Sequence, residues 1–183
     1  MLGFYQNFPV IPHAKATFTS AAPTRALQEA IIKTANHLNS EEIYLDKITS
    51  TPISNCRIGF EFGIADGVTF NYLNPEEVDR FLKSLAEKET VLNIDFLCVV
   101  KYYLANGENQ KRRPLKFDHY LLRFLFRKPE AQLRVFHERG TQHMSIEELI
   151  EFLTKRISTE LEKANTKPLR LMRIMHPVPI GDL

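Results

Sequence analysis

Two stretches of this sequence constrain its fold more than any other feature: residues 92–104 and 115–139. Both consist largely of strand-forming residues, with apolar side chains at every second position over most of their length. This alternation is typical of an extended strand with one buried face. A turn around Lys128-Pro129 divides the second stretch. The sequence therefore predicts three consecutive antiparallel strands, here called the meander (residues 94–139).

Apolar spacing also predicts the register of the meander, meaning which side chains meet across neighbouring strands. On the inner face, Phe124 should lie opposite Leu133. The apolar phase of the middle strand changes near Asp118-His119, so we expect a bulge there. Before the bulge, Phe117 should point inward.

On the outer face, the same register sets Arg123 opposite Arg134, with Asp95 nearby on the first strand. Like charges directly opposite each other destabilise a sheet, by up to ~1 kcal/mol. Two guanidinium groups can bind a phosphate or a carboxylate through paired hydrogen bonds. Arg123 and Arg134 are therefore candidate anion-binding residues. The alternative is a hydrated face on which Asp95 and Glu138 balance the arginines.

Apolar side chains share this outer face with the arginines. They are Leu97, Val99, Leu121, Leu125 and Phe136. A contiguous apolar surface of this kind is usually covered. Three helices need not cover both faces of one sheet completely. A second copy of the chain could therefore pack against the part of the outer face that stays open. The five residues are thus the predicted interface of a homodimer.

Three other segments carry the signals of helices. The first opens at Pro23-Thr24, the second is capped by Asn74 ahead of Pro75, and the third starts with a Ser145–Glu148 capping box. Short strands are expected at both ends of the chain. The predicted fold class is α+β, with one largely antiparallel sheet (β-α-β-β-α-β-β-β-α-β) packed by three helices.

A hairpin is expected just before the second helix. A three-residue loop, Ala65-Asp66-Gly67, sets Phe62 opposite Phe70 on the core side, whereas a two-residue Asp66-Gly67 loop mixes apolar and polar positions. We therefore predict the longer loop, with Gly67 in the left-handed conformation of a bulge.

Charge is unevenly distributed along the chain, although the net charge is only +2. Residues 101–139 hold ten basic and four acidic side chains. The basic run Lys111-Arg112-Arg113, with Lys116 after it, would attract phosphates, and Tyr103 could stack on a base. The alternative is a hydrated hairpin tip. The excess is smaller than in a dedicated nucleic-acid-binding domain, so we do not expect nucleic acid to be the main partner.

Histidines and carboxylates gather near one end of the last two meander strands. His119, His137 and Glu138 are the candidate catalytic residues, because a carboxylate can orient a histidine as a general base. The alternative is an edge pair plus a core histidine bonded to Tyr120. The histidines lack the spacing of a metal site, and no cofactor motif stands out. We therefore expect no metal and no cofactor, and favour a protein without enzymatic activity.

Length and composition indicate one globular domain over residues 1–183, with residues 1–13 and 177–183 as extended tails. No apolar run approaches the ~20 residues of a membrane helix, so we expect no membrane partner. Two cysteines are too few for a disulfide scaffold, which favours a reducing, cytoplasmic location.

The leading functional hypothesis is a non-catalytic binding or assembly protein that uses the outer face of the meander. A small anion and a second copy of the chain are its expected partners. An enzyme with a site near His119, His137 and Glu138 is the second hypothesis. A nucleic-acid-binding protein that uses residues 111–116 is the third. The sequence points to no particular substrate or pathway.

Overall fold

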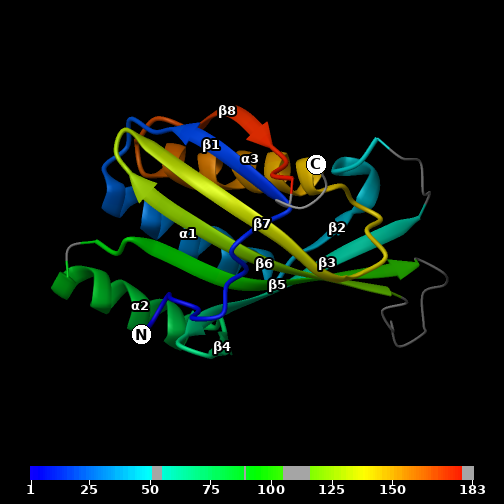
Figure 1. Cartoon of the computed structure of the whole chain (residues 1–183), viewed down its shortest axis with the longest axis horizontal. Helices are drawn as coiled ribbons and strands as arrows, with labels where there is room; N and C mark the ends of the chain where they lie inside the picture. The colour runs from blue at the N-terminus through cyan, green and yellow to red at the C-terminus, as the bar shows by residue number, and fades with distance from the viewer. Residues whose placement is uncertain (51–54, 89, 105–115, 179–183) are drawn as a thin grey trace.

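The computed structural model describes residues 1–50, 55–88, 90–104 and 116–178. Within these ranges, eight strands form one open antiparallel sheet accompanied by three α-helices (Figure 1). The strands are β1 (Ala14–Thr19), β2 (Glu42–Tyr44), β3 (Cys56–Asp66), β4 (Thr69–Tyr72), β5 (Asn93–Leu104), β6 (Lys116–Arg127), β7 (Glu130–Gly140) and β8 (Arg170–Met175). The helices are α1 (Thr24–Leu38), α2 (Pro75–Lys88) and α3 (Ile146–Lys163).

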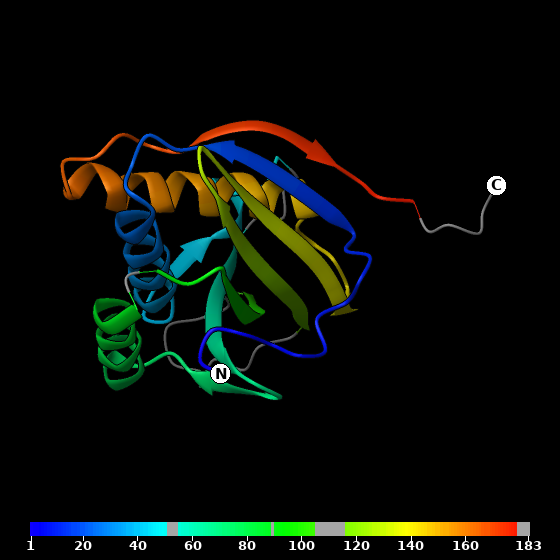
Figure 2. The ribbon, with the colours of Figure 1, turned by 60° about the vertical axis from the view of Figure 1, so that its left-hand side comes forward.

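The predicted α+β fold is confirmed, with one antiparallel sheet, three helices and the predicted order of elements, to which the structure adds the short strand β2 between α1 and β3. Strand order across the sheet is β2-β3-β5-β6-β7-β1-β8, with β4 paired to β3. The first and last strands of the chain therefore lie side by side, next to the meander. Helices α1 and α3 cover one face of the sheet, and α2 lies beside α1 (Figure 2).

The core lies between the sheet and the helices, because alternate strand residues point toward α1 and α3. Phe62, Phe96 and Tyr120 are among the largest fully buried side chains. The rings of Phe60 on β3 and Phe152 on α3 stack at 5.3 Å between centroids. Burial of this apolar face is the main source of stability of the sheet.

The predicted starts of the second and third helices are confirmed. The Asn74 side chain accepts a hydrogen bond of 2.9 Å from the backbone N–H of Glu77. Ser145 and Glu148 form the reciprocal capping box. Each cap satisfies backbone N–H groups that the first helical turn leaves without partners.

The register of the meander is confirmed over most of its length. Phe124 lies opposite Leu133, and Arg123 lies opposite Arg134. Asp95 on β5 lies opposite Arg123. The Lys128-Pro129 turn joins β6 to β7, and its peptide bond is cis. The outer face of the sheet therefore carries the arginines, as the spacing predicts.

The predicted bulge lies in the wrong strand. Pairing of β5 with β6 is uninterrupted, so Asp118 points inward, whereas Phe117 points outward and is exposed. The extra residue is Glu138 on β7, because Tyr120 pairs with His137 while His119 pairs with Arg139. A buried carboxylate at position 118 is stable only because it has hydrogen-bond donors, which the apolar pattern does not reveal.

The predicted hairpin loop is also wrong. Ala65 pairs with Phe70, so the turn between β3 and β4 is Gly67-Val68 and Phe62 does not face Phe70. Gly67 does have a positive φ, of 74°. Phe70 lies on the outer face, where its ring contacts Tyr5 at 4.6 Å between centroids. The apolar pattern failed here because the N-terminal segment covers part of the outer face.

Candidate functional site

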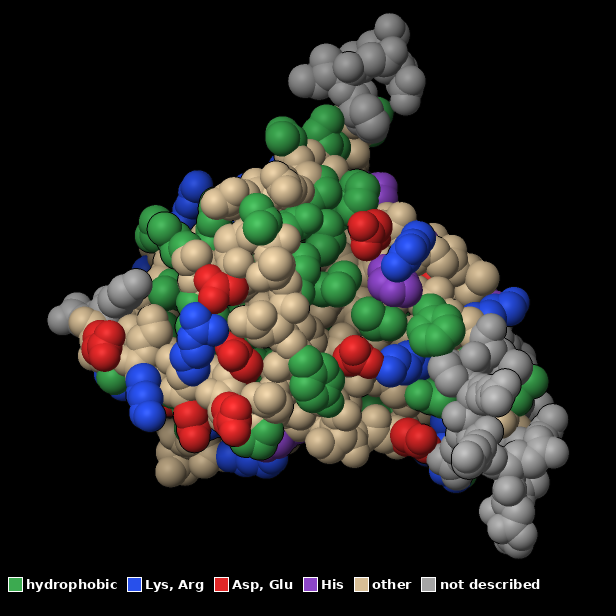
Figure 3. Space-filling view, turned by 90° about the horizontal axis from the view of Figure 1, so that it is seen from below, with side chains coloured by type: hydrophobic (Ala, Val, Ile, Leu, Met, Phe, Trp, Pro, Cys, Tyr) green, Lys and Arg blue, Asp and Glu red, His purple; other side chains and the backbone are tan. Residues whose placement is uncertain are grey.

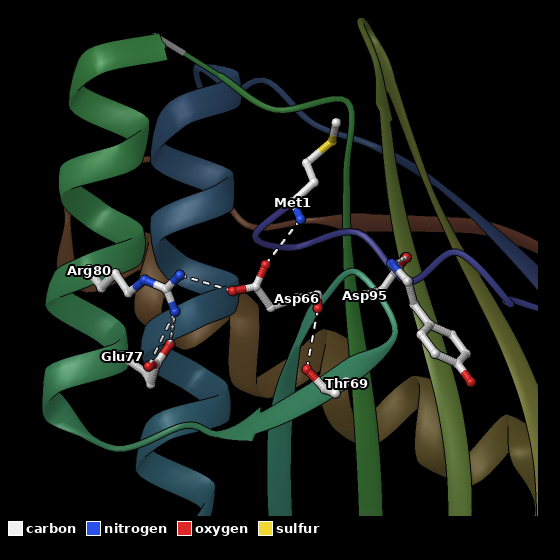
Figure 4. A network of polar contacts seen from close by, with 7 residues as sticks. Met1, Asp66, Thr69, Glu77, Arg80 and Asp95 are labelled. Carbon is white, nitrogen blue, oxygen red and sulfur yellow. Dashed lines mark hydrogen bonds and ion pairs between the residues drawn. The ribbon is translucent and has the colours of Figure 1, made fainter.

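The N-terminal segment, residues 1–13, crosses the outer face of the sheet, on the side opposite the helices (Figure 2). The N–H of Gly3 donates to the carbonyl of Ala65 at 2.7 Å, and its own carbonyl accepts from the N–H of Asp95 at 2.8 Å. The Met1 ammonium pairs with Asp66, which also binds Arg80 on α2 (Figure 4). The segment is therefore attached to the sheet at several points.

Arg123 and Asp95 form the polar centre beneath this segment. The guanidinium of Arg123 makes two bonds of 2.7 Å to the Asp95 carboxylate and one of 2.9 Å to the carbonyl of Tyr5. The rings of Phe4 and Phe8 lie over it at 5.3 and 4.4 Å. Asp95 is 1% exposed. Arg123 therefore anchors the N-terminal segment, and the anion-binding prediction now depends on its neighbour, Arg134.

Arg134 has a different environment from Arg123. Its Nε donates to the side chain of Gln132 at 2.8 Å. Burial, together with the nearby Arg123 and Arg127, lowers the pKa of its guanidinium. A bound anion would relieve this repulsion, because it would favour the charged form.

A cavity of about 140 Å³ opens beside Arg134. We call it the Arg127–Arg134 cavity. Its lining includes Thr17, Leu125, Arg127, Glu130, Gln132 and Arg134. Two guanidinium groups, a hydroxyl and an amide can all donate hydrogen bonds to an oxyanion. Glu130 is the opposing charge in the lining.

The surface around this cavity is strongly basic. Pairing of β7 with β1 sets Lys15 opposite Arg134, and pairing of β1 with β8 sets Arg173 opposite Thr17. We use the term basic face for Lys15, Arg127, Arg134, Arg170 and Arg173. None of the five forms an ion pair within the described part of the chain. Glu130 is the acidic residue that the pairing places among them.

The predicted interface residues lie on the outer face, and the N-terminal segment shields part of them. Leu97, Leu121 and Phe136 form a ladder across β5, β6 and β7. Leu121 is buried, and the ring of His13 stacks on Phe136 at 4.4 Å between centroids. Figure 3, which views the molecule from below along the edge of the sheet, shows hydrophobic side chains interspersed with acidic and basic ones. The homodimer stays a prediction, which sedimentation of the purified protein would test.

The predicted catalytic residues are not brought together. His119 points to the outer face, opposite Arg139, whereas His137 lies opposite Tyr120 on the inner face. The carboxylate that binds His137 is Asp118, at 3.0 Å, rather than Glu138. Sequence reasoning missed Asp118 because it placed the bulge there. An unbroken two-residue period back from Tyr120 would have pointed Asp118 inward.

Asp118 is fully buried and accepts hydrogen bonds from three sides. Besides His137, the hydroxyl of Tyr102 donates at 2.6 Å and the N–H of Gln142 donates at 2.7 Å. Burial and the Asp118 carboxylate raise the pKa of Tyr102, so its hydroxyl stays protonated as a donor. These contacts fasten the ends of β5, β6 and β7 together.

His13 makes the attachment of the N-terminal segment sensitive to pH. Its Nδ1 accepts a bond of 2.9 Å from the N–H of His137, which requires the unprotonated ring. Burial and the nearby His137 lower the pKa of His13. The neutral ring therefore stabilises attachment above the unfolded pKa of about 6.5, and this contribution is lost as pH falls through the folded pKa. His176, which contacts the carbonyl of His13, forms an ion pair with Glu147 at 2.8 Å.

Acidification from neutral pH to pH ~5 is thus expected to speed amide exchange of residues 1–13. The effect should develop below about pH 6.5, the ordinary pKa of histidine, because His13 must be neutral to accept its hydrogen bond. Hydrogen exchange followed by mass spectrometry measures this, after correction for intrinsic exchange rates. In the variant His13→Asn, which retains an acceptor and does not titrate, the pH effect should shrink. An equal effect in both proteins would assign it to another group.

The basic run Lys111-Arg112-Arg113 lies outside the described residues. Lys116 opens β6 opposite Tyr102 and is exposed. Within the described ranges, no group of three or more His, Cys, Asp or Glu side chains could hold a metal ion. No helix in those ranges is long and apolar enough to cross a bilayer. Comparisons of the chain with family models, curated proteins and solved structures gave no match.

Proposed function

We propose that this protein is a non-catalytic binding protein that takes an anionic group in the Arg127–Arg134 cavity. The observation that carries the proposal is the position of Arg134. Its guanidinium lies near two other arginines, and the carboxylate of Asp95 is already bound by Arg123 and the N–H of Tyr5. An oxyanion in the cavity would supply the missing negative charge.

The chemistry of the lining favours a phosphate or a carboxylate. A guanidinium offers two parallel N–H donors that match the oxygen spacing of both groups. Thr17 adds a hydroxyl at the same cavity. Glu130 in the lining disfavours a ligand of high negative charge, so its removal should strengthen binding.

Calorimetric titration with inorganic phosphate at low ionic strength tests this proposal. The variant Arg134→Gln should bind about 10–100-fold more weakly, since a hydrogen bond to a charged group contributes ~1.5–3 kcal/mol. Glu130→Gln should bind more tightly. Arg25→Gln, which removes an exposed arginine of α1, is the matched control and should bind as the parent does. Equal phosphate affinity in the parent and Arg134→Gln would refute the site.

A further inference from the structure

Exposed apolar side chains border the basic face along β8. Met175 lies opposite Lys15 on the outer face and is half exposed. Val178 follows it and is 71% exposed. Between them in sequence, His176 donates a hydrogen bond of 3.1 Å to the carbonyl of His13 in the N-terminal segment. Apolar and basic groups therefore occupy one continuous part of the surface.

The basic face holds more basic residues than those that line the Arg127–Arg134 cavity. Arg127 and Arg134 line the cavity, whereas Lys15 and Arg173 do not. Lys15 and Arg173 lie on β1 and β8, one and two strands beyond β7, and neighbouring strands are ~4.8 Å apart. A single small anion would leave these charges unbalanced. Their arrangement suits a surface that carries many negative groups.

The apolar side chains beside the basic face distinguish two possible polyanions, single-stranded nucleic acid and an anionic bilayer. Single-stranded nucleic acid is held by aromatic rings on which bases stack. The exposed apolar groups beside the basic face, Met175 and Val178, are not aromatic, and such groups enter the interface of a bilayer favourably. Basic residues near an anionic bilayer each add ~1 kcal/mol of attraction.

We propose that the basic face and its apolar border dock on an anionic phospholipid surface. This inference rests on the proposed function, because a headgroup phosphate would occupy the Arg127–Arg134 cavity. Docking of this kind needs no spanning helix. The sequence-based expectation of no membrane partner came from the absence of a long apolar run, which bears on spanning alone.

Cosedimentation with vesicles tests the docking. The full chain should bind vesicles of phosphatidylcholine mixed with phosphatidylserine, and should bind pure phosphatidylcholine weakly. The double variant Lys15→Gln/Arg173→Gln should lose about 25-fold in partitioning, at about fivefold per charge. Arg25→Gln/Lys33→Gln removes two exposed charges of α1, on the other side of the sheet, and is the matched control. Met175→Ser/Val178→Ser should weaken binding without changing its salt dependence.

The outcomes separate this inference from the proposed function. A chain that binds inorganic phosphate but no anionic vesicles overturns the docking and leaves the cavity intact. Vesicle binding that is equal in Lys15→Gln/Arg173→Gln and in the control also overturns it. Tighter binding to a single-stranded oligonucleotide than to the anionic vesicles would replace the lipid by nucleic acid. Vesicle binding insensitive to Arg134→Gln would refute the cavity as the headgroup site.

Discussion

Replacement of Asp95 by alanine is expected to lower the free energy of unfolding by about 3–5 kcal/mol, the usual cost of breaking a buried ion pair by removing one partner. The carboxylate of Asp95 is 1% exposed and takes both bonds of 2.7 Å from Arg123. It also accepts the N–H of Tyr5 at 2.7 Å. Without it, the Arg123 guanidinium stays beneath Phe4 and Phe8 with no counter-charge.

Urea denaturation followed by circular dichroism measures this loss. The double variant Asp95→Leu/Arg123→Met is the control, because it removes both charges and keeps the site filled. It should recover most of the stability, since an apolar pair of similar volume often replaces a buried ion pair at little cost. If Asp95→Ala lowers the free energy of unfolding by less than ~1 kcal/mol, the Asp95–Arg123 pair is hydrated like a surface ion pair and the prediction is wrong.

The second large effect is expected from Gly140→Ala at the end of β7. Gly140 has a φ of 124°, and a Cβ there would lie 2.2 Å from Oδ1 of Asp118 and 2.3 Å from the carbonyl oxygen of Phe117. Backbone strain contributes ~1–3 kcal/mol and the displaced neighbours a further ~1–3 kcal/mol. We expect a loss of about 4 kcal/mol in the free energy of unfolding.

Gly67→Ala provides the matched control for this substitution. Gly67 also has a positive φ, of 74°, but the nearest atom to its Cβ would be the Met1 nitrogen at 3.8 Å. Only backbone strain should act there, at about 1–2 kcal/mol. Equal losses in the two variants would show that the close approach of Gly140 to Asp118 does not matter. Thermal or urea unfolding of both proteins decides between these results.

The candidate site was predictable only in part. The opposed pair Arg123 and Arg134 followed from the apolar spacing of two strands joined by a short turn, because such a turn leaves few possible registers. Lys15 and Arg173 were not found, since β1 pairs with β7 on one side and with β8 on the other, and these strands lie far apart in the sequence. Local periodicity carries no information on pairing over that separation.

By itself, the sequence determined the α+β class, the meander and the helix starts at Asn74 and Ser145, because each depends on residues close together in the chain. Tertiary structure decided which outer-face groups are covered. Residues 1–13 lie over Arg123 and its neighbours, so an apolar side chain such as Phe70 packs on the outer face. The three donors around Asp118 likewise turned that carboxylate inward. Which face such a side chain occupies depends on contacts with residues distant in the sequence. An alternating pattern shows only which positions are apolar, and so it does not predict these contacts.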